Sequence, residues 1–342
     1  MKAVIFDKHG GPEVLRYADV EEPRARANEV LVEVRACALN HLDVWVREGL
    51  PGIEIPLPHI LGNDIAGVVR EVGEVGDWVR TGDEVMLQPG VSCGHCRACL
   101  GGADNLCPQY DILGYRRDGG YAELVSAPAV NVIPKPKNLS WEEAAALPLV
   151  TVTAWHMLVT RAEVQPGEDV LVHAAGSGVG TIGIQIAKLR GARVIATASS
   201  EEKLEKARAL GADEVVNYTH EDWPKEVRRL THKKGVEVVF EHTGAATWRG
   251  SIEALARGGR LVTCGATSGF SARTDIRQLF YRHLTFLGSF MGSKSELLDA
   301  MKFVERGQIR AVVDRTLPLA EAARAHELMQ DRAQFGKLVL TP

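Results

Sequence analysis

Hydrophobic and polar residues alternate along the first third of the chain, which is the pattern of strands that bury one face. The alternation is clear over residues 30–36 and 65–73, and a turn sequence at 80–83 precedes a further strand at 84–87. Short strands separated by glycine-containing turns are typical of a small β-barrel. We therefore predict a barrel-like first domain.

From about residue 150 the pattern changes from alternation to continuous apolar runs. Residues 169–175 form such a run, as a strand requires when it lies in a parallel sheet that is covered on both faces. A helix follows to about residue 189, and a second helix is expected at 200–210. Further strands are expected at 192–197, 214–216, 236–241 and 259–264. This alternation predicts a doubly wound α/β domain, followed by a helix at 294–306 and a strand at 337–340.

Composition and charge exclude several classes of function. The 342 residues include 40 Lys and Arg against 44 Asp and Glu, a net charge of −4, with no run rich in Lys or Arg. No nucleic-acid surface is therefore expected, and a DNA-binding zinc module is disfavoured.

The uncharged stretches near 144–160 and 170–187 contain Pro148, His156 and several glycines, so we expect no membrane span. Charges near the amino terminus argue against a secretion signal, and we expect a cytoplasmic protein that acts on a small molecule.

Four of the six cysteines are clustered within fifteen residues. They are Cys93, Cys96, Cys99 and Cys107, and four thiolates at this spacing are enough to close a tetrahedral zinc site. A closed site leaves no position for a substrate, so we predict one structural zinc in a lobe at about 90–110. An iron–sulfur cluster is the alternative, because the Cys-x2-Cys-x2-Cys spacing also occurs in ferredoxins.

A glycine-rich turn at 175–180 lies between the first predicted strand of the α/β domain and its helix. A dinucleotide pyrophosphate needs small residues there, because backbone N–H groups must approach it closely at a helix amino terminus. Ala175 and Ser177 hold the first two glycine positions of the usual G-x-G-x-x-G spacing, and Gly180 holds the last. Since the strand, helix and second strand are all present, we predict a dinucleotide site.

The end of the second strand of this domain indicates which dinucleotide is used. An NAD site usually has Asp or Glu there to hold the ribose hydroxyls. This chain instead has Ala198, Ser199 and Ser200, followed by Lys203. Without a carboxylate to repel a 2′-phosphate, NADP(H) is favoured, and NAD(H) remains the alternative.

Several motifs together resemble the medium-chain dehydrogenase/reductase superfamily of zinc-type alcohol dehydrogenases and quinone oxidoreductases. Besides the cysteine lobe and the glycine turn, they lie at 9–15, 62–67, 119–123 and 211–213. The resemblance implies an α/β protein with a GroES-like β-barrel catalytic domain, 1–149 and 288–342, and a Rossmann doubly wound parallel-sheet domain, 150–287. It also implies a homodimer or homotetramer.

The same resemblance implies that the ligands of a catalytic zinc are missing. Asn40, Asn63 and Leu149 stand where alcohol dehydrogenases of this family carry Cys, His and Cys, and the usual proton-relay positions are Leu42 and Trp45. Without a Lewis acid, alkoxide formation loses its main stabiliser, whereas hydride addition to a conjugated acceptor needs less help. The chain therefore resembles the quinone oxidoreductase branch, with NADP(H) and a quinone, enone or related carbonyl.

Two alternatives remain open from the sequence. The first is an alcohol dehydrogenase with a displaced catalytic metal, for which the candidate ligands are Cys37, His41, Asp43, His59 and Asp64. The second is a nucleotide-binding protein without catalysis, because a fold does not guarantee chemistry.

The resemblance also names individual contacts. The reaction pocket would include Asn40, Asp43, Trp45 and Asn63. Tyr218 and Lys203 would meet the 2′-phosphate, and Lys337 the pyrophosphate. The remaining cofactor contacts would be His41, Thr153, Gly176, Ser177, Gly178, Val179, Gly180, Ser199, Gly265, Ala266, Phe290 and Met291.

Overall fold

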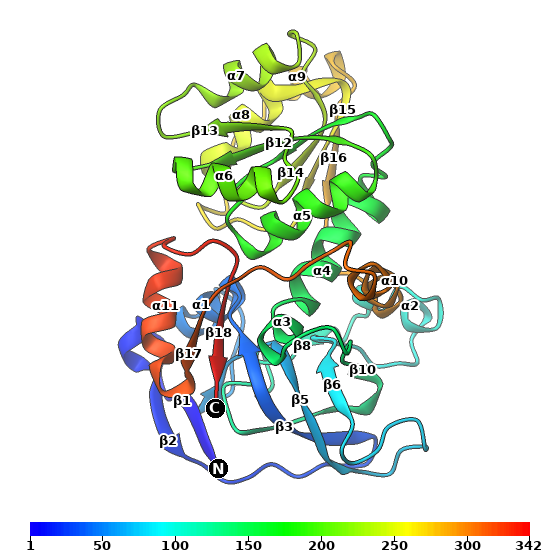
Figure 1. The fold of residues 1–342 in the computed structure, drawn as a ribbon, viewed down its shortest axis with the longest axis vertical. Helices are drawn as coiled ribbons and strands as arrows, with labels where there is room; N and C mark the ends of the chain where they lie inside the picture. Colours follow the sequence, from blue (N-terminus) through cyan, green and yellow to red (C-terminus); the bar gives the residue numbers. More distant parts are fainter. The chain divides into compact units, whose positions relative to one another are not determined.

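The computed structural model describes all residues, 1–342, and divides into two compact units (Figure 1). Unit 1 contains Met1–Val150, Ser293–Met301 and Ala311–Pro342, and unit 2 contains Thr151–Gly292 and Lys302–Arg310. Residues 288–292 and 302–310 thus group with unit 2, whereas the sequence assigned all of 288–342 to the first domain. Within unit 2 the ring of Phe303 lies 5.5 Å from that of Trp155, and the Arg310 N–H donates to Gln185 Oε1 (2.8 Å). These contacts explain the different grouping of residues 302–310.

The main sheet of unit 1 has seven strands, of which six follow the order β10-β6-β5-β3-β18-β17 while β9 pairs with β3. Their bounds are β3 (Glu29–Ala38), β5 (Asp64–Val72), β6 (Glu84–Leu87), β9 (Leu124–Pro128), β10 (Val132–Pro134), β17 (Val313–Pro318) and β18 (Lys337–Thr341). Along β3, the buried Val30, Val32 and Val34 belong to the core of the unit. This is the alternation that predicted the strand.

Smaller elements complete unit 1. A three-stranded sheet contains β1 (Lys2–Phe6), β2 (Arg16–Asp19) and β4 (His59–Ile60), and a two-stranded one contains β7 (Gly90–Val91) and β8 (Asp111–Ile112). The helices are α1 (His41–Glu48), α2 (Arg97–Leu100), α3 (Trp141–Ala145) and α11 (Ala322–Gln330), while α4 (Pro148–Trp155) and α10 (Lys294–Glu305) contribute residues to both units.

Strand register places the ends of three strands together in unit 1. Ala38 of β3 pairs with Val339 of β18 and with Asp64 of β5, both antiparallel. Because the pairing continues in register, residues just beyond Ala38 face the start of β18 and the residues just before β5. Asn40, Asp64 and Lys337 are therefore brought to one edge of the sheet, although they are far apart in sequence.

Unit 2 is built on a six-stranded parallel sheet with the order β13-β12-β11-β14-β15-β16. Its strands are β11 (Asp169–Val172), β12 (Arg193–Ala198), β13 (Glu214–Asn217), β14 (Val236–Glu241), β15 (Leu255–Thr263) and β16 (Thr285–Gly288). Its helices are α5 (Gly178–Leu189), α6 (Glu201–Ala209), α7 (Trp223–Leu230), α8 (Ala245–Ala254) and α9 (Ile276–Tyr281). The strand order reverses at β11 and β14, which is where doubly wound sheets bind ligands.

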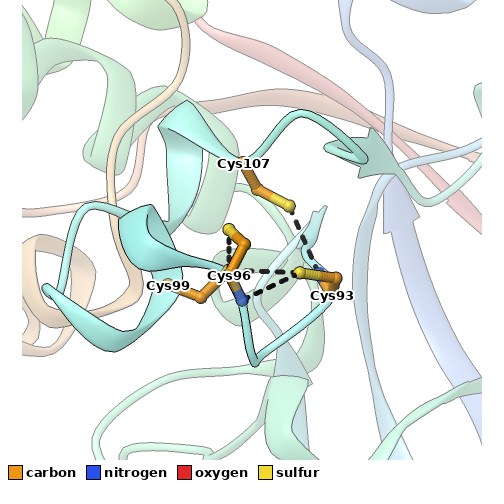
Figure 2. Close-up of side chains that lie close together, drawn as sticks. All are labelled: Cys93, Cys96, Cys99 and Cys107. Carbon is orange, nitrogen blue, oxygen red and sulfur yellow. Dashed lines mark hydrogen bonds between the residues drawn. The ribbon is translucent and has the colours of Figure 1, made fainter.

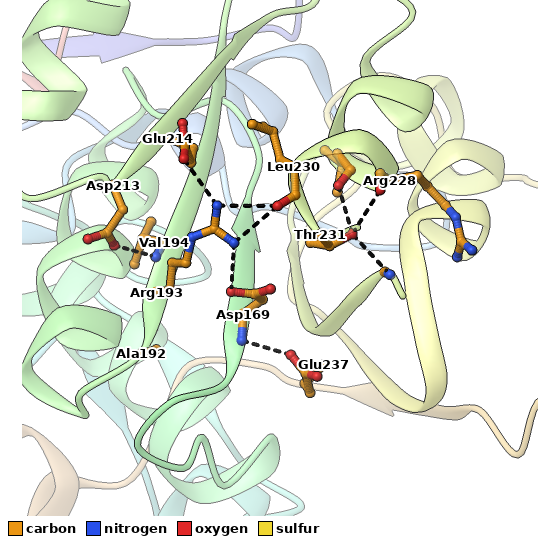
Figure 3. Close-up of polar contacts among 12 residues, drawn as sticks. Asp169, Ala192, Arg193, Val194, Asp213, Glu214, Arg228, Leu230, Thr231 and Glu237 are labelled. Atoms are coloured by element: carbon orange, nitrogen blue, oxygen red, sulfur yellow. Dashed lines mark hydrogen bonds and ion pairs between the residues drawn. The ribbon is translucent and has the colours of Figure 1, made fainter. Parts of the chain in front are cut away.

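One arginine connects three strands at the amino-terminal edge of this sheet (Figure 3). The Arg193 guanidinium, at the start of β12, donates to Asp169 Oδ1 (3.4 Å) and Glu214 Oε1 (3.1 Å). It also donates to the carbonyl oxygen of Leu230 at the end of α7 (3.3 Å). Partly exposed ion pairs contribute little energy, so these contacts add little to the stability of the sheet. No helix in the structure has both the length and the apolar character needed to cross a membrane.

Candidate functional site

The four clustered cysteines converge around one point in unit 1 (Figure 2). Their sulfur atoms all lie within 4.8 Å of one another, with Cys93 Sγ 3.9 Å and Cys96 Sγ 3.5 Å from Cys99 Sγ. A single zinc ion with bonds of about 2.3 Å needs sulfur atoms roughly 3.8 Å apart. An iron–sulfur cluster needs them further apart, because its thiolates bind different irons. The cysteines therefore fit one zinc ion.

Backbone N–H groups donate hydrogen bonds to these sulfur atoms and thereby stabilise their negatively charged thiolate form. The Cys96 N–H donates to Cys93 Sγ (3.4 Å), and the N–H groups of Cys93 and Gln109 donate to Cys107 Sγ (3.4 and 3.3 Å). Backbone donation, first from His95 and then from Cys96, lowers the pKa of Cys93 to about 6. The thiolate form is the one that binds metal.

The glycine turn of unit 2 brings small residues to the amino terminus of α5. Ser177 precedes α5 and its Oγ accepts from the Gly180 N–H (2.9 Å), while Gly178, Val179 and Gly180 form the first turn of the helix. A Cβ on Gly180 would lie 2.5 Å from the carbonyl oxygen of Ala174, so only glycine fits there. The turn and the amino terminus of α5 thus offer backbone N–H groups in a position suited to a phosphate.

The ends of β12 and β13 carry the residues for which a contact with the 2′-phosphate was predicted. Ser199 follows β12, and Ser200 caps α6 by accepting from the Lys203 N–H (3.4 Å). Tyr218 follows β13 with 37% of its surface exposed, and its N–H donates to the carbonyl oxygen of Ala198 (3.2 Å). These residues therefore lie together at one edge of the sheet, as their proposed contact with a 2′-phosphate requires.

Other predicted cofactor contacts are placed by the structure as follows. In unit 2, Gly265 and Ala266 follow β15, and Thr153 Oγ1 lies 4.0 Å from the sulfur of Met291, beside the exposed Phe290. In unit 1, His41 begins α1, and its ring lies 5.1 Å from that of Trp45. Burial lowers the pKa of His41 to about 4, so the imidazole is neutral near pH 7.

A buried hydrogen-bonded cluster occupies the edge of the unit 1 sheet where β3, β5 and β18 meet. Asn40 Nδ2 donates to Asn63 Oδ1 (2.6 Å) and to Asp64 Oδ2 (2.8 Å). The Lys337 ammonium donates to Asn40 Oδ1 (2.6 Å) and to Asp64 Oδ2 (2.9 Å), and the Leu149 N–H donates to Asp64 Oδ1 (2.7 Å). Asp64 therefore connects Asn40 and Leu149, which are two of the three positions that the resemblance equates with zinc ligands.

A second carboxylate, Asp43, supports this cluster from α1. Its Oδ1 accepts from the Gly62 N–H and from Asn63 Nδ2 (both 3.0 Å), and its Oδ2 accepts from the Asn40 N–H (2.8 Å). Burial raises the pKa of Asp43 to about 6, against the opposing effect of these donors. Asp43 and Asp64 are thus both satisfied by protein donors.

The displaced metal site considered from the sequence does not assemble. In the whole chain, the four cysteines are the one group of three or more His, Cys, Asp or Glu residues with ligand atoms close enough to share a metal. Cys37, His41, Asp43, His59 and Asp64 form no such group. Asp43 and Asp64 instead use their oxygen atoms to accept hydrogen bonds.

Comparison with known proteins identifies the family. The family described as alcohol dehydrogenase GroES-like domain matches residues 26–137, and that described as zinc-binding dehydrogenase matches 178–306. A crystal structure of an NAD-dependent alcohol dehydrogenase has a TM-score of 0.97 and 56% identity over 100% of both chains. An NAD-dependent alcohol dehydrogenase of Sulfurisphaera tokodaii is 33% identical over 100% of both chains. A quinone oxidoreductase of Pseudomonas aeruginosa is 34% identical over 100% of this chain and 99% of its own.

This chain belongs to the medium-chain dehydrogenase/reductase superfamily. The family resemblance and the fold class predicted from the sequence are confirmed, and the protein is an oxidoreductase. Within the family fold, unit 1 carries the GroES-like domain and unit 2 the Rossmann-like domain.

Lys337 has a different environment from the one that the resemblance implied. It was expected to contact the pyrophosphate, but it is 3% exposed and its ammonium is bonded to Asn40 and Asp64. The strand at 337–340 was predicted, yet its pairing with β3 was not, so no pattern in the sequence placed Lys337 beside Asn40. The pyrophosphate contact stays an untested prediction.

Sequence analysis also missed a buried polar chain in unit 2. His173 Nε2 lies 2.9 Å from Ser251 Oγ, and Ser251 donates to Glu241 Oε2 (2.7 Å). Glu241 also accepts from the N–H groups of Thr243 (2.7 Å) and Gly244 (3.1 Å), where α8 begins. Two polar residues at the ends of apolar runs, His173 and Glu241, were the signal in the sequence that could have indicated this buried polar chain.

Proposed function

We propose that the protein is an NADP(H)-dependent reductase of quinones, enones or related carbonyl compounds, with one structural zinc and no catalytic zinc. The observation that carries the proposal is the cluster of Asn40, Asn63 and Lys337. The carboxamides of Asn40 and Asn63 stand at two of the positions where the resemblance places the zinc ligands of alcohol dehydrogenases, and the third position is Leu149. Asn40 is bonded to Asn63 and to the Lys337 ammonium. Zinc is held in proteins by Cys, His and carboxylate groups, so the chemistry of this donor set does not fit it.

The cofactor supplies a hydride when it is bound. Backbone N–H groups of the turn at 176–180 would hold its diphosphate, as the close approach at Gly180 supports. For the 2′-phosphate we propose Tyr218, Lys203 and the hydroxyl of Ser199. No carboxylate stands at 198–200, and the nearby Glu201 accepts from Asn217 Nδ2 (3.0 Å).

The proposed substrates follow from what the cluster can stabilise. Hydride addition to the far end of a conjugated acceptor moves an electron pair onto the carbonyl oxygen, which hydrogen-bond donors can stabilise until a proton arrives. Deprotonating an alcohol demands more, since a metal normally lowers the pKa of the bound hydroxyl. The pocket proposed for this step contains Asn40, Asp43, Trp45 and Asn63.

Metal content together with a substrate panel tests the proposal. The purified protein should contain about one zinc per chain and should oxidise NADPH in the presence of quinones or enones. About two zinc ions per chain, with alcohol oxidation lost on chelation, would instead support the alcohol dehydrogenase activity named for the relative at 56% identity. Tight NADPH binding without turnover of any acceptor would favour a nucleotide-binding protein.

The nucleotide preference requires its own measurement, because two of the relatives are named NAD-dependent. We expect kcat/KM to be higher with NADPH than with NADH for the same acceptor. A preference for NADH would overturn the assignment of Lys203 and Tyr218 but leave the proposed reaction in place. The homodimer or homotetramer and the cytoplasmic location remain predictions, and light scattering tests the first.

A further inference from the structure

A fully buried arginine begins a chain of hydrogen bonds in unit 1. Arg47 of α1 has none of its surface exposed, and its Nη1 lies 2.9 Å from Nδ1 of His326 in α11. A guanidinium can only donate, so His326 Nδ1 accepts and the ring proton is on Nε2. Burial lowers the pKa of His326 to about 3, which agrees with a neutral imidazole. The arginine therefore determines the tautomer of the histidine.

Tyr121 continues the chain in the same direction. His326 Nε2 carries the ring proton and donates it to Tyr121 Oη (3.2 Å), so the phenol proton is left for a further acceptor. The ring of Tyr121 packs on Gly62, where an added Cβ would lie 2.5 Å from Cδ1, and the Gly62 N–H is bonded to Asp43 Oδ1 (3.0 Å). Burial raises the pKa of Tyr121 most, and the Asp43 carboxylate raises it further through its charge and a side-chain hydrogen bond. Tyr121 therefore keeps its proton and donates it to Asp43.

The Asp43 carboxylate, at the end of this chain, is surrounded by donors. Besides Tyr121, they are the N–H groups of Gly62 and Asn40 and the Asn63 Nδ2 group. An ionised Asp43 requires that Asn63 turn its NH2 group toward it, which leaves Asn63 Oδ1 to accept from Asn40 Nδ2 (2.6 Å). A proton on Asp43 would face these donors, so the surrounding groups favour the ionised form.

The other charged or titratable groups that influence Asp43 come from the strands of the sheet. They are Cys37 of β3, Asp64 of β5 and Lys337 of β18. Burial raises the pKa of the Cys37 thiol well above its usual value, so the thiol is neutral. Lys337 lowers the pKa of Asp43 and Asp64 raises it, and these two groups are bonded to each other (2.9 Å), so their effects oppose one another. The donor chain through Tyr121 is therefore the unopposed influence that works against burial.

We propose that His326 and Tyr121 are positioning residues of the reduction, because their chain of donors holds Asp43 ionised. Ionised Asp43 in turn holds the Asn63 and Asn40 carboxamides in a single orientation. This inference rests on the proposed function, in which Asp43 and the two asparagines belong to the reaction pocket. The chain transfers no proton, since Nε2 of His326 and Oη of Tyr121 each keep theirs, and neither residue is required to touch the substrate.

Infrared difference spectroscopy measures the protonation of Asp43 without any substrate. The carbonyl stretch of the protonated carboxyl group is assigned by its loss in Asp43→Asn, and it should titrate near pH 6 in the unaltered protein. Tyr121→Phe removes the hydroxyl and keeps the ring. Because the lost hydrogen bond favours the ionised carboxylate, the midpoint should rise by about one pH unit. The matched control is Tyr115→Phe, since Tyr115 also packs against the core of unit 1 and should leave the midpoint unchanged.

Two substitutions of His326 test the direction of the chain. The carboxamide of His326→Gln can accept from Arg47 and donate to Tyr121, as the imidazole does, whereas His326→Leu can do neither. We expect the midpoint of Asp43 to stay within about 0.3 pH units of the unaltered protein in His326→Gln and to rise in His326→Leu. The rise should be smaller than in Tyr121→Phe, because the phenol is still present. If Tyr121→Phe does not fold, this pair of variants is measured in its place.

The pH dependence of the reaction shows whether an ionised Asp43 serves the reduction. With NADPH and the quinone or enone that the unaltered enzyme reduces fastest, kcat/KM should fall below about pH 6. In Tyr121→Phe this acidic limb should move up with the infrared midpoint, while kcat on the alkaline plateau stays within about threefold. A merely structural role of Tyr121 would instead lower the rate by a similar factor at every pH.

The outcomes for the inference and for the proposed function are distinct. An infrared midpoint that stays within about 0.3 pH units in both Tyr121→Phe and His326→Leu overturns the inference, and so does an acidic limb that does not follow the midpoint. Equal rises in His326→Gln and His326→Leu would also contradict it. If the midpoint shifts as expected but the unaltered enzyme reduces no quinone or enone, the chain still holds Asp43 ionised and the proposed function is what fails.

Discussion

Ser251 connects two buried groups of unit 2 through a single hydroxyl, and alanine at this position would remove both connections. The hydroxyl donates to Glu241 Oε2 at 2.7 Å and lies 2.9 Å from His173 Nε2. Since its one proton goes to Glu241, it accepts from the His173 N–H. All three residues are almost fully buried, so water cannot replace the hydroxyl.

The expected cost follows from these two hydrogen bonds. A hydrogen bond to a charged group contributes about 1.5–3 kcal/mol, and a buried N–H without a partner costs about 1–3 kcal/mol. Because one hydroxyl serves both, the effects overlap, and we expect about 3 kcal/mol for Ser251→Ala. Loss of one oxygen atom leaves little cavity, so packing adds little to this value.

Amide hydrogen exchange followed by mass spectrometry measures the effect on unit 2 alone. Exchange in β11 and β14 should become roughly a hundredfold faster, as about 3 kcal/mol implies. Ser126→Ala is the matched control, because Ser126 donates to the more exposed Glu29 (2.9 Å) in unit 1 and should change exchange little. Exchange in β11 and β14 that stays within threefold of the unaltered protein would refute the view that this hydroxyl links them.

Three further predictions concern the zinc lobe, the cofactor and acid stability. Cys96→Ser should remove the zinc and lower the stability of unit 1, while the protein that remains folded still turns over its substrate. Metal analysis with an activity assay tests this, and inactivity with zinc retained would contradict a structural role. Lys203→Glu should raise the KM for NADPH far more than that for NADH through like-charge repulsion, and equal losses would remove the specificity argument. Burial lowers the pKa of His173 from 6.5 to about 4, so its contribution to stability is present above pH 6.5 and is lost as the pH falls towards 4. The free energy of opening of β11, from exchange rates corrected for their intrinsic pH dependence, should fall by up to about 3 kcal/mol over that window, and no change would show that the pKa of His173 is not lowered in the folded protein.

The fold was predictable from the sequence wherever one strand pattern dominated. Residues 84–87 and 236–241 are strands at the predicted bounds, because the first lies in an alternating region and the second is a continuous buried run. The run at 169–175 ends as a strand at Val172, since Ala174 adopts a positive φ of 44° at the phosphate turn. β15 begins at Leu255 rather than 259, because Arg257 and Gly258 hide its start.

The candidate sites were predictable only where their residues are close in sequence. The four cysteines and the glycine turn each lie within a short segment, so local spacing carries the signal. Lys337 and Asp64 are 273 residues apart and meet through antiparallel pairing on both sides of β3. No periodicity determines which strands become neighbours in a mixed sheet, and the contacts of Lys337 with Asn40 and Asp64 therefore required the structure.

The kinds of donor group at the cluster, more than its charge, distinguish it from a catalytic zinc site. A zinc ion with two thiolates and an imidazole is neutral as a whole. Here Asp64 is matched by Lys337, whereas Asp43 is held by neutral donors and its pKa is raised by burial to about 6. Asn40, Asn63 and Lys337 supply neither thiolate nor imidazole to this cluster. Under the proposed function, such a cluster would suit hydride addition to a carbonyl compound and would give little help in removing a proton from an alcohol.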